Sequence, residues 1–278
     1  MKTANAYFLI LATCFFAAAG CKRIVKPTDN AVRFDSIDVN ESYYLFNDTA
    51  QPGCNIQIHY VYPDSSGEQT LQNWFIDKMF GETFRDLTPE EVLKEYAQHY
   101  IDDFKRFETP KGRKLYAEDN DNQYADSSGY AYYTQLKNSI LYNQNGFISF
   151  IVESVDYAGG MYNSKCVYAY VVNLATGDFL KEEDFSGINY RKNLSATLID
   201  KIVAANGLNN AGELENLGYA LSDIAPNDNF TIDNEGITYY FNENEIAGVR
   251  EGVIRVFIPY EEIKLYVADN SPIASFFE

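Results

Sequence analysis

The sequence predicts an α+β protein with mostly antiparallel sheet, helices packed on it, and two subdomains. Three observations support this prediction. Alternating apolar and polar runs cluster with hairpin turns, helical patterns fall in separate blocks, and no internal repeat of fixed period is present. A parallel fold of alternating strands and helices is therefore not expected. The chain has 278 residues, of which 46% are hydrophobic, and this is enough for a sizeable core.

The first twenty residues have the layout of a secretory signal peptide. Lys2 precedes an uncharged stretch over residues 6–19, which is shorter than the roughly 20 residues that a membrane-spanning helix needs. The end of this stretch and the two residues that follow it, Ala18-Ala19-Gly20-Cys21, resemble a bacterial lipoprotein signal. The resemblance implies cleavage before Cys21, diacylation of Cys21, and a lipid-anchored protein outside the cytoplasm. Residues 21–40 are expected to form a tether, because they contain few core-forming side chains.

The mature chain keeps two further cysteines, Cys54 and Cys166. An oxidising compartment permits a disulfide between them. Both lie in strand-like runs, so two buried free thiols are an equally good interpretation.

Residues 41–140 are predicted to form an N-terminal α+β subdomain. Residues 54–62 alternate in polarity and end at Pro63-Asp64, as a half-buried strand does. A helix is predicted over 69–80. A second begins at Thr88, with Pro89 in the first turn and Glu91 three residues after the cap, and runs to about residue 107. Residues 111–128 lack an apolar period and are predicted to be a loop.

Residues 141–278 are predicted to form a C-terminal α+β domain. Asn145-Gly146 is a strong hairpin signal between strands. A helix is predicted over 190–205, stopped by Asn206-Gly207, and a closing helix over 259–266. The remaining strand patterns are at 130–136, 139–142, 147–154, 166–174, 230–233, 237–241 and 253–258.

Charge and composition exclude several classes of protein. The 22 Lys and Arg residues against 40 Asp and Glu give a net charge of −18, which argues against nucleic-acid binding. The 23 Tyr and 19 Phe residues argue against disorder. No phosphate-binding loop, dinucleotide fingerprint or catalytic-serine elbow is present, and His59 and His99 alone cannot supply a three-histidine zinc site. No cofactor and no metal are expected.

Short motifs in the C-terminal half resemble those of RsiV-like extracytoplasmic domains. They include Asp156-Tyr-Ala-Gly-Gly160, Lys181-Glu-Glu-Asp-Phe185, Gly236-Ile-Thr-Tyr-Tyr-Phe241 and Val256-Phe-Ile-Pro-Tyr260. The segment 55–107 resembles the small domain of unknown function that usually precedes that family. The resemblance implies a cell-envelope binding module, here expected without the family's transmembrane and signalling segments. Met161-Tyr162-Asn163 and Gly248-Val249 depart from the family pattern in two loops, so lysozyme recognition cannot be carried over.

The leading hypothesis is a non-enzymatic lipoprotein that binds a wall-acting protein such as lysozyme, or peptidoglycan itself. An acidic domain suits a basic partner, because opposite charges accelerate encounter. The contact surface is expected at two loops, whose candidate residues are Tyr157, Gly159, Gly160, Tyr162, Glu245 and Arg250.

Two alternatives stay open. One is a glycan or peptide hydrolase that uses carboxylates such as Asp156, Asp184 or Glu245, which would have to converge in a cleft. The other is an envelope scaffold protein with no small ligand. The abundant tyrosines suit recognition of proteins or sugars, but they are also good strand residues.

Overall fold

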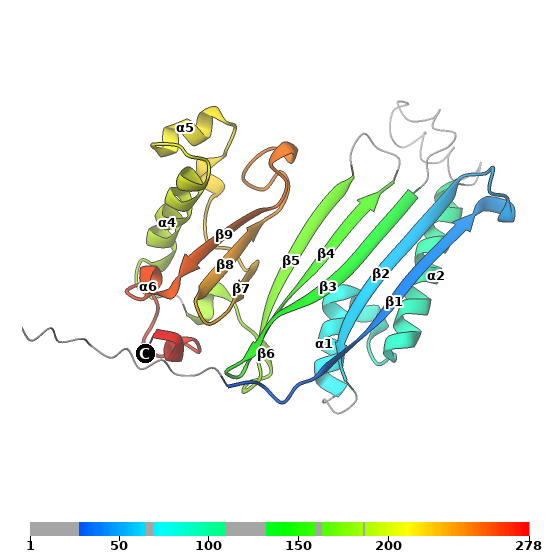
Figure 1. Ribbon diagram of the computed structural model, residues 1–278, viewed down its shortest axis with the longest axis horizontal. Helices are drawn as coiled ribbons and strands as arrows, with labels where there is room; N and C mark the ends of the chain where they lie inside the picture. The colour runs from blue at the N-terminus through cyan, green and yellow to red at the C-terminus, as the bar shows by residue number, and fades with distance from the viewer. Residues whose placement is uncertain (1–27, 65–68, 109–131, 159–162, 186, 278) are drawn as a thin grey trace, which may run out of the picture.

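Two β-sheets lie side by side and form the frame of the protein (Figure 1). The computed structural model describes residues 28–64, 69–108, 132–158, 163–185 and 187–277. The predicted signal peptide, Cys21, the loop at 111–128, Gly159, Gly160 and Tyr162 therefore lie outside the described residues. Within the described parts the fold is α+β, as predicted, and all neighbouring strands but one pair are antiparallel.

The first sheet has six strands in chain order. They are β1 (Phe34–Tyr44), β2 (Gly53–Pro63), β3 (Tyr132–Gln144), β4 (Phe147–Tyr157), β5 (Ser164–Asn173) and β6 (Asp178–Phe179). The parallel pair is β2 with β3. A parallel pair needs a long crossover, and this one contains α1 (Gln69–Met79) and α2 (Pro89–Glu108).

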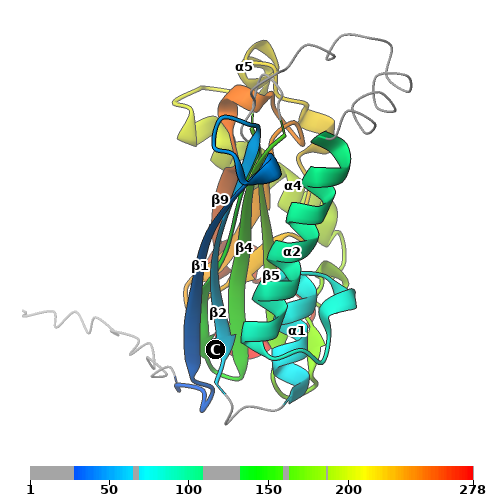
Figure 2. The same cartoon turned by 90° about the vertical axis from the view of Figure 1, so that its right-hand side faces the viewer.

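Both helices cover one face of the first sheet (Figure 2). The predicted start of α2 is confirmed: the Glu91 amide donates to the Thr88 hydroxyl at 3.3 Å, and the Thr88 amide donates to the Glu91 carboxylate at 2.9 Å. The core between helices and sheet includes Ile56, Phe75 and Phe150, and the last two rings stack at 4.3 Å. Burial of this aromatic and aliphatic surface holds the layer together.

The predicted hairpin joins β3 to β4. Asn145 and Gly146 have φ angles of 54° and 81°, the left-handed conformations of a tight two-residue turn. From Tyr132 on, where the described structure resumes, the two strand patterns predicted at 130–136 and 139–142 fall in one strand, β3, whose register shifts between Ile140 and Tyr142.

The second sheet has three strands and its own helices. These elements are β7 (Phe230–Ile232), β8 (Gly236–Phe241), β9 (Ile254–Pro259), α4 (Tyr190–Ala205), α5 (Ala211–Asn216) and α6 (Tyr260–Ile263). Short 3₁₀ helices occur at Leu45–Asn47, Glu82–Phe84, Glu182–Asp184, Leu221–Asp223, Val249–Glu251 and Ala274–Phe277. The core of this layer also takes in Tyr142, Phe147 and Val171 from the first sheet, so the two sheets share buried surface.

The second sheet and its helices form what we call the second layer. Side-chain amides join this layer to the edge of β5. Asn229 Oδ1 accepts from the Ala169 amide at 2.6 Å, and its Nδ2 donates to the Val167 carbonyl at 3.0 Å. Asn242 Oδ1 accepts from the Val167 amide at 2.7 Å. These amides take the place of a neighbouring strand along β5.

Two sequence-based boundaries need correction. Residues 34–40, expected to be part of the tether, belong to β1, which pairs with β2 from Phe34 to Tyr44. The expected boundary at 140 falls inside β3, which is hydrogen-bonded to both β2 and β4. The first sheet therefore extends across that boundary, because backbone pairing between distant segments leaves no mark on local composition.

Candidate functional site

The face of the first sheet opposite α1 and α2 carries a polar surface of amide and tyrosine side chains. Side chains alternate along a strand, so Ile56 and Ile58 of β2 face the helices while Asn55 and Gln57 face the other way. Towards β4 and β5 the second layer covers this face, where Ile151, Val167 and Ala169 pack around Tyr240. We call the part that none of the other described elements covers, over β1–β3 and the adjoining ends of β4 and β5, the open face.

Strand register places amide and tyrosine side chains in neighbouring rows across the open face. Gln57 lies opposite Gln135, whose Nε2 donates to Gln57 Oε1 at 2.9 Å. In the next row, Asn55 lies opposite Tyr133, and Tyr133 lies opposite Tyr157. The two tyrosine rings stack with their centroids 5.6 Å apart.

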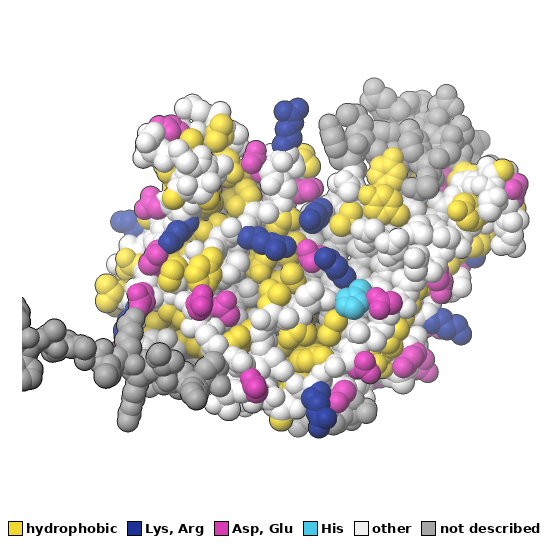
Figure 3. Space-filling model, viewed as in Figure 1, with side chains coloured by type: hydrophobic (Ala, Val, Ile, Leu, Met, Phe, Trp, Pro, Cys, Tyr) yellow, Lys and Arg dark blue, Asp and Glu magenta, His cyan; other side chains and the backbone are white. Residues whose placement is uncertain are grey.

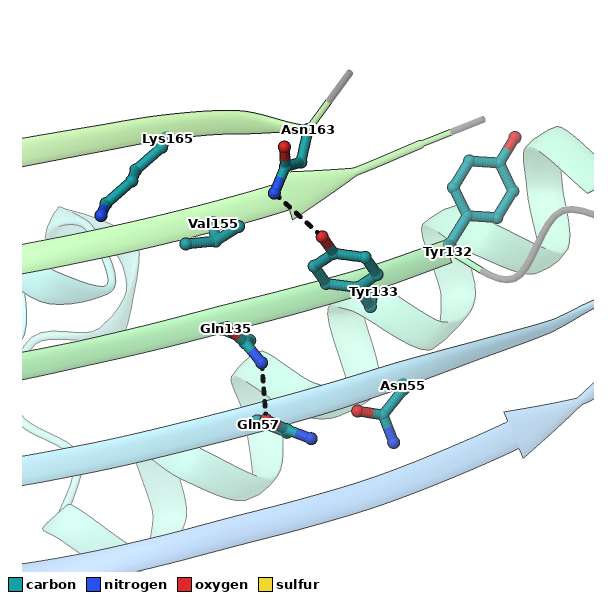
Figure 4. Close-up of a pocket in the computed structure, with 8 residues that line it drawn as sticks. All are labelled: Asn55, Gln57, Tyr132, Tyr133, Gln135, Val155, Asn163 and Lys165. Atoms are coloured by element: carbon teal, nitrogen blue, oxygen red, sulfur yellow. Dashed lines mark hydrogen bonds between the residues drawn. The ribbon is translucent and has the colours of Figure 1, made fainter. Parts of the chain in front are cut away.

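These rows surround a hollow of about 520 Å³ (Figure 4). Its lining residues come from β2 to β5 and the segment before β5: Asn55, Gln57, Tyr132, Tyr133, Gln135, Val155, Asn163 and Lys165. Asn163 Nδ2 donates to the Tyr133 hydroxyl at 3.1 Å, which braces the rim. Lys165 is the one charged residue among the eight that line the hollow.

A row of paired polar and charged side chains borders the hollow on the side nearer the sheet centre. His59 Nδ1 lies 2.8 Å from Asp38 Oδ1, and Lys137 Nζ lies 2.9 Å from Glu153 Oε2. Arg255 of β9 reaches the same glutamate at 3.4 Å. In Figure 3, which views this face, charged side chains are scattered among uncharged polar surface over β1–β3. Apart from Lys165, the residues that line the hollow present neutral hydrogen-bonding groups, aromatic rings and the side chain of Val155.

The structure brings only some of the predicted contact residues to this place. Tyr157 adjoins the hollow through its stack with Tyr133. Glu245 and Arg250 lie between β8 and β9 and do not line it. Glu245 accepts hydrogen bonds from Asn227 Nδ2 at 3.1 Å and from the Asn242 amide at 2.7 Å, so it organises its own turn.

The carboxylates proposed for hydrolysis lie on three different elements. Asp156 is on the helix-covered side of β4, where burial raises the pKa of Tyr96 and the charge of Asp156 adds to that rise. Asp184 accepts from the Lys181 amide at 2.7 Å in a 3₁₀ helix, and Glu245 stands in the turn after β8. Among the described residues, no group of three or more His, Cys, Asp or Glu side chains converges as metal ligands. None of the helices described here has the length and hydrophobicity of a membrane span.

Cys54 and Cys166 are both free. They lie on β2 and β5, which β3 and β4 separate. Three strand spacings amount to about 14 Å, whereas a disulfide needs Cα atoms within about 7 Å. The structure thus favours free thiols over the disulfide, but only Cys54 is buried and Cys166 is half-buried. Burial raises the pKa of Cys54 to about 11, which keeps this thiol unreactive.

Sequence reasoning did not single out the amides at the hollow. Asn55 and Gln57 of β2 and Gln135 of β3 alternate along their strands with Ile56, Ile58 and Leu136, whose buried side chains lie on the other face of the sheet. Polar alternation was visible in the sequence, but it predicts only a solvent-facing side. Which amides meet depends on the parallel register of β2 and β3.

The architecture defines a two-layered α+β protein in which a six-stranded sheet, backed by two helices, carries a smaller three-stranded unit. The sequence over residues 177–261, which contains that smaller unit, matches the family described as "Protein of unknown function (DUF3298)". Similarity to a solved structure extends over nearly the whole chain. A DUF3298 family member from Bacteroides fragilis NCTC 9343 shares 31% identity, with 91% of this chain and 99% of that chain covered and a TM-score of 0.77. The chain belongs to the DUF3298 family.

A second solved structure extends the likeness at the level of the fold. A DUF3298 family protein from Pseudomonas aeruginosa PAO1 is 12% identical, with 86% of this chain and 96% of that chain covered and a TM-score of 0.56. No curated protein matches the sequence. The expected relation to RsiV-like domains and to their accompanying small domain is not confirmed by these matches, and it stays a prediction.

Proposed function

We propose that this chain is a non-enzymatic lipoprotein of the bacterial cell envelope that binds the glycan of peptidoglycan on its open face. The observation that carries the proposal is the hollow lined by amides and tyrosines. A pyranose ring offers hydroxyl and N-acetyl groups around an apolar face. Side-chain amides both donate and accept hydrogen bonds, and tyrosine supplies an aromatic surface with a polar tip.

The charge of the site fits a neutral or weakly acidic sugar polymer. The bordering carboxylates are paired, as Asp38 with His59 and Glu153 with Lys137, and Lys165 projects at the rim. A lysine at this position suits the free carboxylates of the peptide stems of peptidoglycan. Among the described residues, the eight that line the hollow include no Asp or Glu, so they supply no pair of carboxylates for hydrolysis.

Binding of the domain to insoluble peptidoglycan, at low and moderate salt, tests this function. Gln135→Ala removes a side chain from the middle of the hollow and is expected to weaken binding about five- to tenfold, the equivalent of one or two hydrogen bonds. Tyr133→Phe removes the hydroxyl, keeps the ring stack and is expected to have a smaller effect.

The matched control is Gln98→Ala, on the exposed side of α2, where the amide bonds only locally to Asp102 at 2.8 Å. This variant should bind as the unsubstituted protein does. Lysozyme is the parallel probe. Salt-resistant capture of lysozyme without capture of peptidoglycan would reassign the face to a protein partner. No retention on either would reject the proposed function.

A further inference from the structure

The short link between Cys21 and the folded chain constrains which end of the molecule meets the membrane. Seven residue steps separate Cys21 from Thr28, where the described structure begins. Whatever their arrangement, they span at most about 25 Å. If Cys21 carries the lipid, as proposed above, the protein surface around Thr28 must stay close to the bilayer.

The position of Thr28 is set by the β3–β4 hairpin. Its amide donates to Asn145 Oδ1 at 2.9 Å, and its carbonyl accepts from the Asn145 amide at 2.8 Å. Two residues later, Asn30 Nδ2 donates to the Phe147 carbonyl at 2.8 Å. The chain therefore enters the fold at the tip of this hairpin.

The same end of the molecule carries two aliphatic side chains that are almost fully solvent-exposed. Ile188 is 89% exposed and Leu265 is 88% exposed. They lie on adjacent segments, since the Gly187 amide donates to the Tyr266 carbonyl at 2.8 Å. The approach is so close that a Cβ at position 187 would lie 2.5 Å from that carbonyl oxygen.

Aromatic packing ties these segments to the hairpin. The ring centroid of Phe276 lies 5.7 Å from that of Phe147, which follows the hairpin turn. It lies 5.2 Å from the ring centroid of Tyr260, the first residue of α6. The chain then leads through α6 to Leu265. Figure 1 shows α6 and the C-terminal residues at the end of the molecule where the described chain begins.

We propose that this end is a membrane-docking surface on which Ile188 and Leu265 enter the headgroup region of the bilayer. Two exposed aliphatic residues bind a bilayer weakly, but a short lipid anchor keeps them at a high local concentration of lipid. Lys192, close in sequence to Ile188, suits lipid phosphates. Lys264 lies next to Leu265 in the sequence, but its Nζ donates to the Phe277 carbonyl at 2.8 Å. The net charge of −18 opposes attraction to anionic lipid, so the contact depends on the anchor.

This orientation places the hollow at the end of β3 that is farther from the bilayer. The hollow lies near the start of β3, at Tyr133, and the docking surface near its end, at Gln144. Eleven strand steps amount to about 36 Å. The proposed glycan site would thus stand away from the lipid surface.

Tryptophan quenching by brominated lipid tests the docking surface. The full-length lipoprotein, extracted from membranes, is reconstituted on vesicles of phosphatidylethanolamine and phosphatidylglycerol, with and without dibrominated phosphatidylcholine. Leu265→Trp and Ile188→Trp are each expected to be quenched by the brominated lipid. The signal of the native Trp74, measured in the unsubstituted lipoprotein, is subtracted.

The matched control is Phe46→Trp. Phe46 is 76% exposed and follows β1, whereas the chain enters at the other end of that strand. The fluorescence of the tryptophan introduced at position 46 should not be quenched. Equal quenching at positions 46 and 265, or none at 188 and 265 in protein that floats with the vesicles, would overturn the orientation. Blue-shifted emission at 265 without lipid quenching would instead indicate contact with a second copy, and would also overturn it.

The inference rests on the proposed lipidation, and the readouts keep the proposals apart. Failure of the full-length protein to float with vesicles would reject the anchor and the docking surface together. The peptidoglycan assay is independent of both, because it is made on the domain without its lipid.

Discussion

Glu182 is a buried carboxyl whose ionisation is linked to folding near neutral pH. It opens the 3₁₀ helix Glu182–Asp184 and accepts a hydrogen bond from the Tyr239 hydroxyl at 2.6 Å, and that hydroxyl lies 2.9 Å from the hydroxyl of Tyr190. Burial raises the pKa of Glu182 to about 8, against the lowering effect of hydrogen bonds from Tyr239 and Tyr190. At neutral pH this carboxyl is therefore mostly protonated in the folded protein.

The raised pKa predicts a loss of stability as pH rises. An unfolded glutamate releases its proton near pH 4.5, but the folded protein holds it until about pH 8. The contribution of Glu182 to the free energy of unfolding should therefore decline across this window, by at most about 1.4 kcal/mol per pH unit. Urea unfolding at several pH values measures the slope. Glu182→Gln, a neutral isostere, should flatten it, and Glu183→Gln, at an exposed neighbour, should leave it unchanged. Equal slopes in Glu182→Gln and the unsubstituted protein would contradict the prediction.

At the scale of elements, asparagine side chains replace strand backbone where pairing stops. Asn138 of β3 accepts from the Val61 amide at 2.7 Å and donates to the Val61 carbonyl at 2.6 Å, just beyond the last β2–β3 pair at His59. Asn229 does the same for β5 and also donates to the Tyr240 carbonyl at 3.1 Å. A planar amide presents the same donor and acceptor as a peptide group.

Loss of such an amide should lower the free energy of unfolding substantially. Asn229→Ala leaves the backbone groups of Val167 and Ala169 without this partner and is expected to destabilise the protein by about 3 kcal/mol. Asn229→Asp keeps the acceptor for the Ala169 amide but sets a carboxylate against the Val167 carbonyl, so it should also destabilise. Chemical denaturation measures both. Asn40→Ala, on the exposed side of β1, is the control and should shift stability by no more than about 0.5 kcal/mol. A similar small shift for Asn229→Ala would show that water satisfies the edge of β5.

At the scale of the whole molecule, the two sheets share buried core surface. The second layer buries its core against Tyr142, Phe147 and Val171 of the first sheet, and Ser149 Oγ donates to the Ile232 carbonyl at 2.7 Å. The residues that match the family profile, 177–261, therefore contain only part of their own core.

This shared core predicts one cooperative unfolding transition for the domain. Circular dichroism and tyrosine fluorescence should give coincident urea curves, because neither layer is stable without the other. A fragment of residues 177–278 should lack a cooperative transition, since the apolar surface that contacts Phe147 would be exposed to water. Two separated transitions in the intact domain, or a folded fragment, would show that the layers are independent.

The sequence by itself predicted the elements that have strong local signals. The cap at Thr88 placed α2, Asn145-Gly146 placed the β3–β4 hairpin, and the apolar periods placed β2 and α4. Each signal depends on residues a few positions apart, whose side chains interact within one element whatever the rest of the chain does. The closing helix was predicted too long, because α6 ends after one turn at Ile263.

The tertiary structure alone decided the arrangement of the sheets and the site. β1 escaped prediction because it is an edge strand whose apolar side chains, such as Ile37 and Val39, are only half buried and alternate weakly. The hollow on the open face exists because the β2–β3 register sets Gln57 beside Gln135 and Asn55 beside Tyr133. A crossover of about seventy residues separates those strands, and pairing across such a distance is chosen by the packing of the whole core rather than by the local sequence.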